Sequence, residues 1–425
     1  MTRFLVLAAY NVLLPLFFVF AFPGWLMKMA KRGGLGTGLL ERFGKFKEDS
    51  DYEKQGAVYI HAVSVGEVLI AIKLIKEWQR QHPEERFILV PTTATGHEVA
   101  IEHAPDAVRV IYSPLDFSFI TRSVFKRFAP KQIVLMESEI WPNMLNVARK
   151  MNIPVSIANA RLSPRSEGRY MKLGLILRPL LEMISKLCAQ DDEDRNRWIN
   201  VGMAAEKVVV TGSVKFDQDG ASVLVPQKRD EFTEMLAGLQ HEHDEPVVMA
   251  ISTHAGEEAW IANALDSLQS KVLLVLVPRH AERRAEVKSD LEKLGNAVVL
   301  RSDYKDLRGA SLVVDSTGEL RDWTAHADIV IVGKSILGKG GQNPTEAMAA
   351  RVPVITGPNM QNFQPLVEDI KRKDGVTEIS SEQELLDAVQ MLLADKELAS
   401  CQCDAALEVL EFHQGATSRT VDELT

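Results

Sequence analysis

Short apolar runs alternate with longer amphipathic stretches along most of the chain. After Gly66 the helical pattern of apolar positions continues as far as Arg80. In the first half, the apolar runs fall at 57–63, 87–91, 108–112, 133–136, 155–158, 187–189 and 208–210. Short apolar strands that alternate with helices are typical of parallel sheets buried on both faces. The pattern therefore predicts an α/β fold.

A polar segment near the middle of the chain predicts a domain boundary. Residues 217–245 are mostly polar, include Pro226, and end in a charged run before Pro246. Apolar runs then resume at 247–251, 272–277, 297–300, 312–314, 329–332 and 352–355, and helical patterns cover 382–394 and 398–412. We therefore expect two doubly wound, Rossmann-like halves. Their ligands should bind beyond the carboxyl ends of the strands, in a cleft between the halves.

The first two dozen residues break this alternation. The run from Phe4 to Leu26 is apolar apart from a few positions, of which Asn11 and Pro15 lie in its middle. About 20 apolar residues suffice to cross a membrane as a helix. The residues that follow are strongly basic: Lys28, Lys31, Arg32, Arg42, Lys45 and Lys47, against the single acid Glu41. The positive-inside rule then places the rest of the chain in the cytoplasm.

Two alternatives remain for this segment. A cleaved signal peptide is disfavoured, because the apolar run is long and no small-x-small cleavage site closely follows it. We therefore expect an uncleaved anchor. Pro15 leaves open whether the anchor spans the bilayer or lies partly in its interface.

Composition narrows the class of protein further. The chain has 425 residues, 46% hydrophobic and 25% charged, which is typical of a folded protein with more than one domain. A net charge of −9 argues against general nucleic-acid binding. The three cysteines, Cys188, Cys401 and Cys403, are too few for a disulfide framework, and no histidine lies near enough in the sequence to suggest a zinc site.

In the first half, charged residues follow three of the predicted strands. Glu67 would begin a helix, where it could stabilise the positive helix end or act as a general base. Glu137 and Glu139 come directly after another strand, and Arg161 after the next, so that they form either a structural ion pair or part of a site. Lys215 follows a later strand and could neutralise charge on a substrate.

The second half has features of an anion-binding site. Ser252 and His254 lie between a strand and a helix, where backbone N–H groups are exposed to an anion. Arg279, after Pro278, is suited to phosphate or carboxylate. Further strand ends carry Thr317, Gly318 and Glu319, and then a glycine-rich loop that leads into a helix with Gly341, Gln342, Asn343, Pro344, Thr345 and Glu346. Glu346 could accept hydrogen bonds from a ribose diol. Each motif alone also fits an ordinary helix cap.

Two motifs resemble other sites without matching them. Residues 333–339 fit G-x-x-x-x-G-K, but Gly340 occupies the position where a Walker loop needs Ser or Thr. The acidic run 191–194 resembles a metal site, yet it follows a strand and opens a helix, which favours helix capping. We therefore expect neither ATPase chemistry nor a metal centre.

Taken together, the motifs resemble those of the 3-deoxy-D-manno-octulosonic acid (Kdo) transferases over nearly the whole chain. The resemblance rests on the order and spacing of HAVSVGEV (61–68), ESEIWPN (137–143), NARLSPRS (159–166), residues 212–217, STHAGEE (252–258), PRH (278–280) and GGQNPTE (340–346). It implies the GT-B glycosyltransferase architecture, which consists of two Rossmann-like domains facing a central cleft. The implied parts are an anchor at 1–27, an acceptor-binding domain at 28–218, a linker at 219–245 and a CMP-sugar-binding domain at 246–425.

The resemblance also implies an activity. Such enzymes transfer Kdo from CMP-Kdo to the tetraacyldisaccharide precursor of lipid A (lipid IVA), at the cytoplasmic face of the inner membrane. By resemblance, Glu67 is the base, and Glu137 and Lys215 stabilise the transition state. Pro278, Arg279, 317–319 and 343–346 contact the CMP-sugar. No metal or other cofactor is implied beyond the donor CMP-Kdo, and inversion at the anomeric carbon is expected.

One position departs from the family pattern. Gln342 stands where the family usually has histidine, and glutamine keeps a donor and an acceptor but cannot carry charge. This departure keeps two alternatives open. The first is another GT-B sugar-nucleotide transferase, and the second is a catalytically weakened membrane protein that binds nucleotide or lipid.

Overall fold

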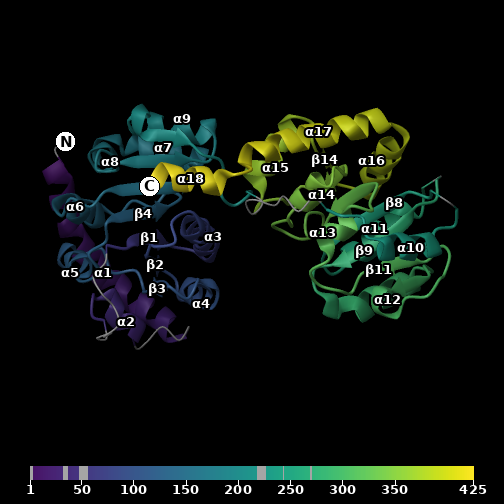
Figure 1. Cartoon of the computed structure of the whole chain (residues 1–425), viewed down its shortest axis with the longest axis horizontal. Helices are drawn as coiled ribbons and strands as arrows, with labels where there is room; N and C mark the ends of the chain where they lie inside the picture. The colour runs from purple at the N-terminus through teal and green to yellow at the C-terminus, as the bar shows by residue number, and fades with distance from the viewer. Residues whose placement is uncertain (1–2, 32–36, 47–55, 218–225, 243, 269) are drawn as a thin grey trace. The chain divides into compact units, whose positions relative to one another are not determined.

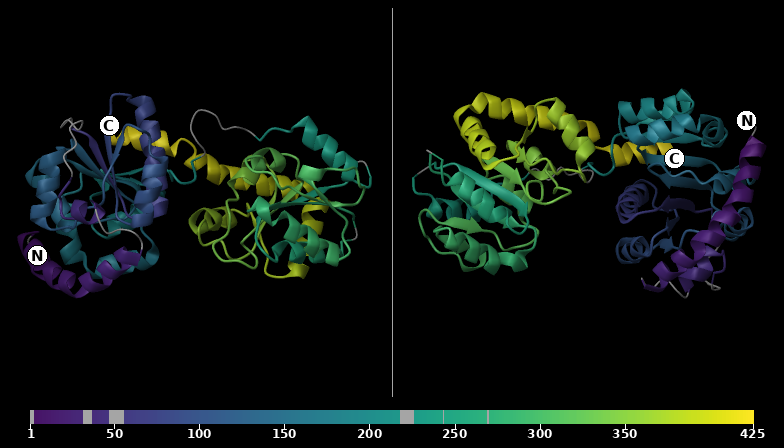
Figure 2. Two further views of the ribbon diagram at one scale, coloured as in Figure 1. Left: turned by 90° about the horizontal axis from the view of Figure 1, so that it is seen from below. Right: turned by 180° about the vertical axis from the view of Figure 1, so that it is seen from behind.

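The computed structural model describes residues 3–31, 37–46, 56–217, 226–242, 244–268 and 270–425. The chain forms two compact units. Unit 1 comprises Met1–Gly220 together with His413–Thr425, and unit 2 comprises Ala221–Phe412. Each unit contains a seven-stranded sheet (Figures 1 and 2). All the strand pairs are parallel, which confirms the α/β prediction.

The sheet of unit 1 has the strand order β3-β2-β1-β4-β5-β6-β7. Its strands are β1 Val58–Ala62, β2 Phe87–Pro91, β3 Val108–Val110, β4 Gln132–Met136, β5 Val155–Ala160, β6 Lys186–Ala189 and β7 Val208–Val210. Its helices are α1 Arg3–Lys31, α2 Thr37–Arg42, α3 Val65–Gln81, α4 Ala94–His103, α5 Ser118–Phe128, α6 Pro142–Lys150, α7 Pro164–Lys172, α8 Gly174–Leu181, α9 Asp192–Asn200 and α18 Ala416–Leu424.

Helices cover both faces of this sheet. On one face the buried side chains of α3, α4 and α18 form a core with alternate residues of the central strands. On the other face α5, α6, α8 and α9 form a second core, to which Val6 and Leu7 of α1 belong. Burial on both faces explains why these strands are uninterrupted apolar runs in the sequence.

The sheet of unit 2 has the order β10-β11-β9-β8-β12-β13-β14. Its strands are β8 Val247–Thr253, β9 Leu273–Pro278, β10 Val298–Leu300, β11 Ser311–Val313, β12 Ile329–Val332, β13 Val354–Thr356 and β14 Thr377–Glu378. Its helices are α10 Asp230–Leu239, α11 Glu257–Leu265, α12 Arg284–Lys293, α13 Leu320–Thr324, α14 Thr345–Ala349, α15 Gln364–Arg372, α16 Glu382–Ala394 and α17 Lys396–His413. Buried residues of α11, α12 and α16 pack on one face of the sheet.

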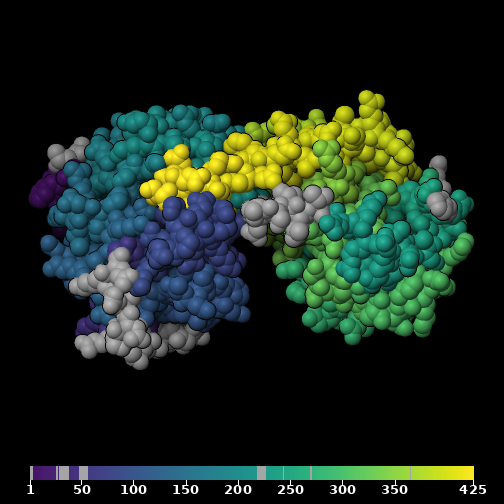
Figure 3. Space-filling model, in the orientation of Figure 1, coloured from purple at the N-terminus to yellow at the C-terminus, as the bar shows by residue number. Residues whose placement is uncertain are grey.

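The structure differs from the expected domain boundaries in two places. Within the segment predicted as a linker, 230–239 form helix α10, whose buried Phe232 ring stacks on Trp323 at a centroid distance of 3.8 Å. Residues 218–225 of that segment lie outside the described residues. At the carboxyl end, 413–425 belong to unit 1, not to the second domain, because Val421 and Leu424 are buried in the core with α3. Figure 3 shows this yellow segment on the surface of unit 1 beside the blue α3.

Each sheet has one point at which the strand order reverses. In unit 1 it lies between β1 and β4, and in unit 2 between β8 and β12. Loops that leave neighbouring strands in opposite directions open a crevice at such a point, which is where α/β sheets bind ligands. We therefore expect ligand-binding residues at the two reversal points.

Candidate functional site

Glu67 and Glu137 flank the reversal point of unit 1. Glu67 lies in the first turn of α3, just after β1, and Glu137 directly follows β4. Because β1 and β4 are hydrogen-bonded neighbours, these two residues lie close together although 70 positions separate them in the chain. The sheet thus brings together two of the three residues expected to be catalytic.

The Glu67 carboxylate closes the amino-terminal turn of α3. It accepts hydrogen bonds from the backbone N–H of Val63 at 2.8 Å and from the Ser64 hydroxyl at 2.9 Å, while the Ser64 oxygen accepts one from the Glu67 N–H. This reciprocal arrangement is a capping box. Only 8% of Glu67 is exposed. The helix-stabilising role that the sequence left open is therefore present, and the role of base stays a prediction.

Three carboxylates and two cations shape the electrostatics of this edge. Burial, and then the charge of Glu67, raise the pKa of Glu137, whereas Arg161 and Lys215 act in the opposite direction. Burial is also the main cause that raises the pKa of Glu139 to about 7, with Glu67 and Glu137 adding to it. A carboxyl group with such a pKa can exchange a proton near neutral pH. The sequence left open whether Glu139 belongs to a structural ion pair or to a site.

Lys215 belongs to the same cluster. Burial lowers the pKa of its ammonium group, Glu137 raises it and Arg161 lowers it. Arg161 itself is exposed beyond β5. A lysine beside a carboxylate and an arginine is suited to meet an anionic group that enters the site.

The turn that carries Lys215 is held by residues far away in the sequence. Asn159 Oδ1 accepts the N–H of Val214 at 3.0 Å, and His413 Nδ1 accepts the N–H of Ser213 at 3.1 Å. The Asp217 carboxylate accepts the N–H groups of Gly415 and Thr417, each at 2.8 Å. The sequence analysis missed the role of Asp217 and His413, because no local pattern links positions about 200 residues apart.

Residues with left-handed backbone conformation occur at strand ends in both units. Glu137, Asn159, Ser252 and Lys334 have φ values of 56°, 52°, 52° and 56°. All four lie at carboxyl ends of strands, and such conformations cost roughly 1–3 kcal/mol in residues other than glycine. Strain of this kind persists where the surroundings impose it, and functional loops are where it concentrates.

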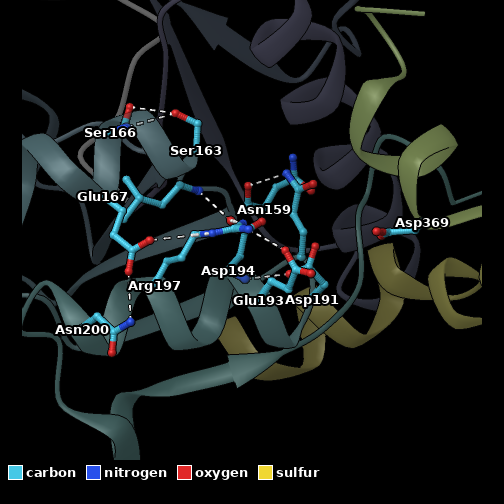
Figure 4. Close-up of polar contacts among 12 residues, drawn as sticks. Asn159, Ser163, Ser166, Glu167, Asp191, Glu193, Asp194, Arg197, Asn200 and Asp369 are labelled. Atoms are coloured by element: carbon cyan, nitrogen blue, oxygen red, sulfur yellow. Dashed lines mark hydrogen bonds and ion pairs between the residues drawn. The ribbon is translucent and has the colours of Figure 1, made fainter. Parts of the chain in front are cut away.

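The acidic run 191–194 serves as a helix cap. Asp191 accepts the N–H of Asp194 at 2.6 Å at the start of α9, and Asp194 accepts the N–H of Leu162 at 2.7 Å (Figure 4). Arg197 forms ion pairs with Glu193 and Asp194. The capping interpretation of this run is confirmed.

The residues expected to bind the donor follow four adjacent strands of unit 2. Thr317, Gly318 and Glu319 follow β11, and Pro278 and Arg279 lie at the end of β9. Ser252 ends β8 with His254 just beyond it, and the loop that contains 341–346 follows β12. In the sheet these strands stand in the order β11-β9-β8-β12. The predicted donor residues therefore share one edge of one sheet, across its reversal point.

Glu257 joins two of these loops. Its buried carboxylate accepts the N–H of His254 at 2.9 Å and that of Lys334 at 2.6 Å. It also accepts the N–H groups of Ile336 and Leu337, at 3.3 and 3.4 Å. Three backbone N–H groups of 333–339 thus donate to a carboxylate instead of facing a phosphate, which agrees with the absence of the Walker Ser or Thr. Glu257 lies within the STHAGEE motif, but no local pattern in the sequence indicates that it joins the two loops.

Close approach of the two loops requires glycine at 333. A Cβ there would lie 2.4 Å from the carbonyl oxygen of Ser252. This contact is far shorter than van der Waals separation, so any side chain would push the loop after β12 away from the end of β8. The glycine therefore sets the distance between two segments of the predicted donor site.

Glu346 presents a carboxylate at this edge. Its Oε2 is buried and has no hydrogen-bond partner among the described residues. Burial raises its pKa, and the charges of Arg321 and Arg279 oppose that effect. The exposed Asn343 makes a local hydrogen bond, in which its Oδ1 accepts the Thr345 hydroxyl at 2.9 Å. An unpaired carboxylate oxygen near two arginines fits a ligand with both hydroxyl and anionic groups.

The Glu319 carboxylate is bound to two arginine side chains. Its Oε1 accepts hydrogen bonds from Arg229 at 3.1 Å and from Arg301 at 2.9 Å. The carboxylate therefore organises the loop after β11 through ion pairs, while Thr317 and Gly318 are exposed. The sequence analysis had not identified Arg229 or Arg301.

Helix α1 contains the predicted anchor. Its stretch Arg3–Gly24 is long and apolar enough to cross a membrane, by length and composition. Of the basic residues that follow, Arg32 and Lys47 lie outside the described residues. The helix thus agrees with an anchor and does not by itself identify the membrane or the side on which the units lie.

Two successive Rossmann-like units, each with charged residues at the reversal point of its sheet, define the GT-B class of glycosyltransferases. UDP-GlcNAc 2-epimerase from Neisseria meningitidis shares this fold with a TM-score of 0.54, at 13% identity over 87% of this chain and 99% of that chain. Residues 37–218 match the family described as 3-deoxy-D-manno-octulosonic-acid transferase (kdotransferase).

Relatives in sequence identify the family. The 3-deoxy-D-manno-octulosonic acid transferase of Haemophilus influenzae is 35% identical over 395 residues, which cover 91% of this chain and 90% of that protein. The C-terminal CMP-Kdo binding domain of WaaA from Acinetobacter baumannii is 31% identical; it covers 43% of this chain and 100% of that domain, with a TM-score of 0.39. This chain belongs to the Kdo transferase family.

Proposed function

We propose that this chain transfers Kdo from CMP-Kdo to the lipid A precursor lipid IVA during lipopolysaccharide synthesis. Its membership of the Kdo transferase family supports the transferred sugar. The cluster of Glu67, Glu137 and Glu139 with Arg161 and Lys215 is the main structural support, because it combines proton acceptors with cations at one sheet edge. The acceptor and the mechanism go beyond what family membership establishes.

The proposed reaction is a single displacement. Glu67 takes the proton of an acceptor sugar hydroxyl while that oxygen forms a bond to the anomeric carbon of Kdo. On the opposite face the bond from this carbon to the phosphate oxygen breaks, and CMP leaves with the electron pair. Attack opposite to the leaving group inverts the configuration. Glu137 and Lys215 stabilise the charges that develop in the transition state.

Unit 2 is proposed to hold the donor. Glu346 accepts hydrogen bonds from the ribose hydroxyls, and Arg279 pairs with the phosphate. Ser252, His254, Gly341 and Gln342 complete the proposed pocket. We propose that these groups manage the leaving-group charge without a metal ion.

We further propose that the enzyme works at the cytoplasmic face of the inner membrane. Lipid IVA is itself embedded in a membrane, so an anchored enzyme searches for it in two dimensions. By the positive-inside rule, the basic residues that follow the apolar run in the sequence favour the cytoplasmic side, and the exposed Lys45 among them is available to anionic headgroups, whereas Arg42 is buried.

Product analysis tests the proposal. Purified protein is incubated with CMP-Kdo and lipid IVA, and the lipid is analysed by mass spectrometry. We expect lipid IVA to gain Kdo, with inverted anomeric configuration by nuclear magnetic resonance. Parallel reactions with UDP-GlcNAc, and with an unrelated glycolipid acceptor, serve as controls. Transfer from UDP-GlcNAc but not from CMP-Kdo would refute the donor, and transfer to neither acceptor would favour a weakened homologue.

A further inference from the structure

Helix α1 lies lengthwise on unit 1, as both views of Figure 2 show. Its buried and half-buried residues recur at helical spacing along one side, at positions 3, 6, 7, 10, 14, 18, 21 and 22. Positions three or four apart share one face of a helix, and this stripe spans about 28 Å at 1.5 Å per residue. The contact with unit 1 therefore runs along nearly the whole apolar segment.

Polar contacts secure this docking in the first half of the apolar segment. The Tyr10 hydroxyl donates to Asp116 at 3.0 Å, and the amides of Asn11 and Asn143 bond to each other twice, each at 3.0 Å. Asp116 and Asn143 are 5% and 0% exposed. Asp116 also accepts the N–H groups of Asn143 and Met144, which begin α6. These contacts tie the centre of the apolar segment to the polar start of a helix in unit 1.

Aromatic contacts continue the docking. The Phe18 ring meets Phe117 edge-on at 5.6 Å and Phe43 at 6.4 Å. If α1 crossed the bilayer in this docked position, Asp116, Asn143 and the start of α6 would have to enter hydrocarbon, where polar groups are costly. If it detached, the buried Asp116 would lose the hydrogen bond of the Tyr10 hydroxyl and the buried Asn143 would lose the amide of Asn11, which would destabilise unit 1.

The opposite face of α1 is exposed and apolar. Phe4, Val12, Phe17 and Phe20 are 77%, 65%, 70% and 85% exposed. Large apolar side chains are also exposed on two other helices of the same unit, Phe119 of α5 and Leu175 of α8, at 73% and 74%, and α8 contacts α1. Several large apolar side chains exposed on one unit indicate an interaction site.

Charge indicates what covers this surface. Helices α7 and α8 carry exposed basic residues, Arg165, Arg169, Lys172 and Arg178, against the single acid Glu167. Exposed apolar residues of the same two helices, Met171, Leu173, Leu175 and Ile176, lie among them. Apolar side chains interleaved with basic ones fit the interface of a bilayer that has anionic headgroups.

We propose that α1 does not cross the membrane but lies in its plane, with its exposed face in one leaflet and its docked face on unit 1. Helices α7 and α8 form a second contact with the anionic headgroups. The inference resolves the choice between spanning and interfacial anchors that the sequence left open. It does not depend on which sugar or acceptor the enzyme uses.

Topology provides the first test. Arg3→Cys places a thiol at one end of α1, and the exposed Cys401 of unit 2 serves as an internal reference, since Cys188 and Cys403 are buried. The variant is reconstituted into sealed vesicles of phosphatidylethanolamine and phosphatidylglycerol and treated with a membrane-impermeant maleimide. We expect individual molecules to be labelled at both positions before lysis. A spanning helix would make the two labels mutually exclusive until detergent is added, which would overturn the proposal.

Vesicle binding provides the second test. Leu13→Glu with Phe17→Glu changes two exposed residues of α1, while Leu307→Glu with Met391→Glu makes the matched change on unit 2. We expect the first pair to lower partitioning onto the same vesicles at least about tenfold and the control pair to leave it unchanged. If the first pair instead converts a lipid-free dimer to a monomer with unchanged vesicle binding, a second copy of the chain covers α1.

Discussion

Glu67 caps a helix and is also the residue proposed as the general base. Its carboxylate completes the capping box of α3, and its charge raises the pKa of two further carboxyl groups. Its hydrogen bonds come from Ser64 and Val63, within the same turn. Mutations that separate the cap from the carboxylate can therefore separate stability from catalysis.

We predict that Glu67→Gln lowers kcat for Kdo transfer at least about 100-fold, the range lost when a general base is removed. Glutamine still accepts the capping-box hydrogen bond of the Ser64 N–H, but its amide nitrogen cannot accept the Val63 N–H, so we expect a loss of stability of about 1 kcal/mol. Ser64→Ala is the matched control: it removes the cap, at a cost of about 1 kcal/mol, and keeps the carboxylate. Steady-state kinetics measures kcat and urea unfolding measures stability, for both variants. Full transfer by Glu67→Gln would exclude Glu67 as the base.

The raised pKa of Glu139 leads us to predict that stability depends on pH. Its pKa is raised to about 7 in the folded state, above the value of about 4.5 for the free side chain. Between these values the folded state binds more protons than the unfolded state, so this group favours folding less as pH rises. Glu139→Gln should therefore stabilise the protein more at pH 8 than at pH 5 in urea unfolding. The exposed Glu282→Gln serves as control, and an equal effect of Glu139→Gln at both pH values would contradict the prediction.

At the scale of elements, single carboxylates connect segments that the chain order separates. Asp217 caps the start of α18 and thereby ties the carboxyl terminus to the turn of Lys215. Glu257 ties the loop after β8 to the loop after β12. In both cases one buried acceptor satisfies several backbone donors, which would otherwise be unpaired.

We predict that Asp217→Ala destabilises unit 1 by about 1–3 kcal/mol, because the N–H groups of Gly415 and Thr417 lose their acceptor. It should also lower kcat for Kdo transfer, since the Lys215 turn is released. Asp422→Ala, an exposed residue of the same helix, provides the control. Urea unfolding and steady-state kinetics measure both effects, and wild-type behaviour of Asp217→Ala would refute the role of α18.

Glu257→Gln tests the connection in unit 2. The amide nitrogen cannot accept the hydrogen bonds that one carboxylate oxygen now takes from His254 and Lys334. We predict that the two loops separate and that CMP binds at least about tenfold more weakly by calorimetry, equal to ~1.4 kcal/mol. Unchanged affinity would mean that the loops do not form the nucleotide pocket.

At the scale of the whole molecule, the proposed catalytic residues and the predicted donor contacts lie in different units. The cluster with Glu67, Glu137 and Lys215 belongs to unit 1, and the predicted donor contacts belong to unit 2. Each unit has its own sheet and its own core. A ligand that binds only one unit should therefore stabilise that unit first.

Hydrogen exchange of the full chain with CMP tests this division. We predict slower exchange in 252–258 and 333–346 of unit 2, because CMP orders these loops. Peptides that cover 63–68 should exchange at the same rate with and without CMP. Protection confined to the unit 1 peptides would mean that CMP binds unit 1. This result would overturn the assignment of the donor residues to unit 2.

Much of the fold was predictable because its pattern is local. Strands buried on both faces leave apolar runs, so β2, β7 and β12 were predicted at their observed limits. The strand β14, Thr377–Glu378, was missed because two residues leave no pattern. The helix α10 was missed because a polar surface hid its buried stripe of Phe232, Met235, Leu236 and Leu239.

For the sites, the sequence by itself determined which residues follow the strands, since polar side chains there interrupt apolar runs. Only the tertiary structure decided which strand ends are neighbours, and so brought Glu67 beside Glu137 across β1 and β4. It also joined Asp217 to Thr417, 200 positions apart, and laid one face of α1 on unit 1. The physical reason is that burial and backbone geometry act within a few residues and are visible in sequence. Hydrogen bonds between distant segments depend on the order in which the strands assemble.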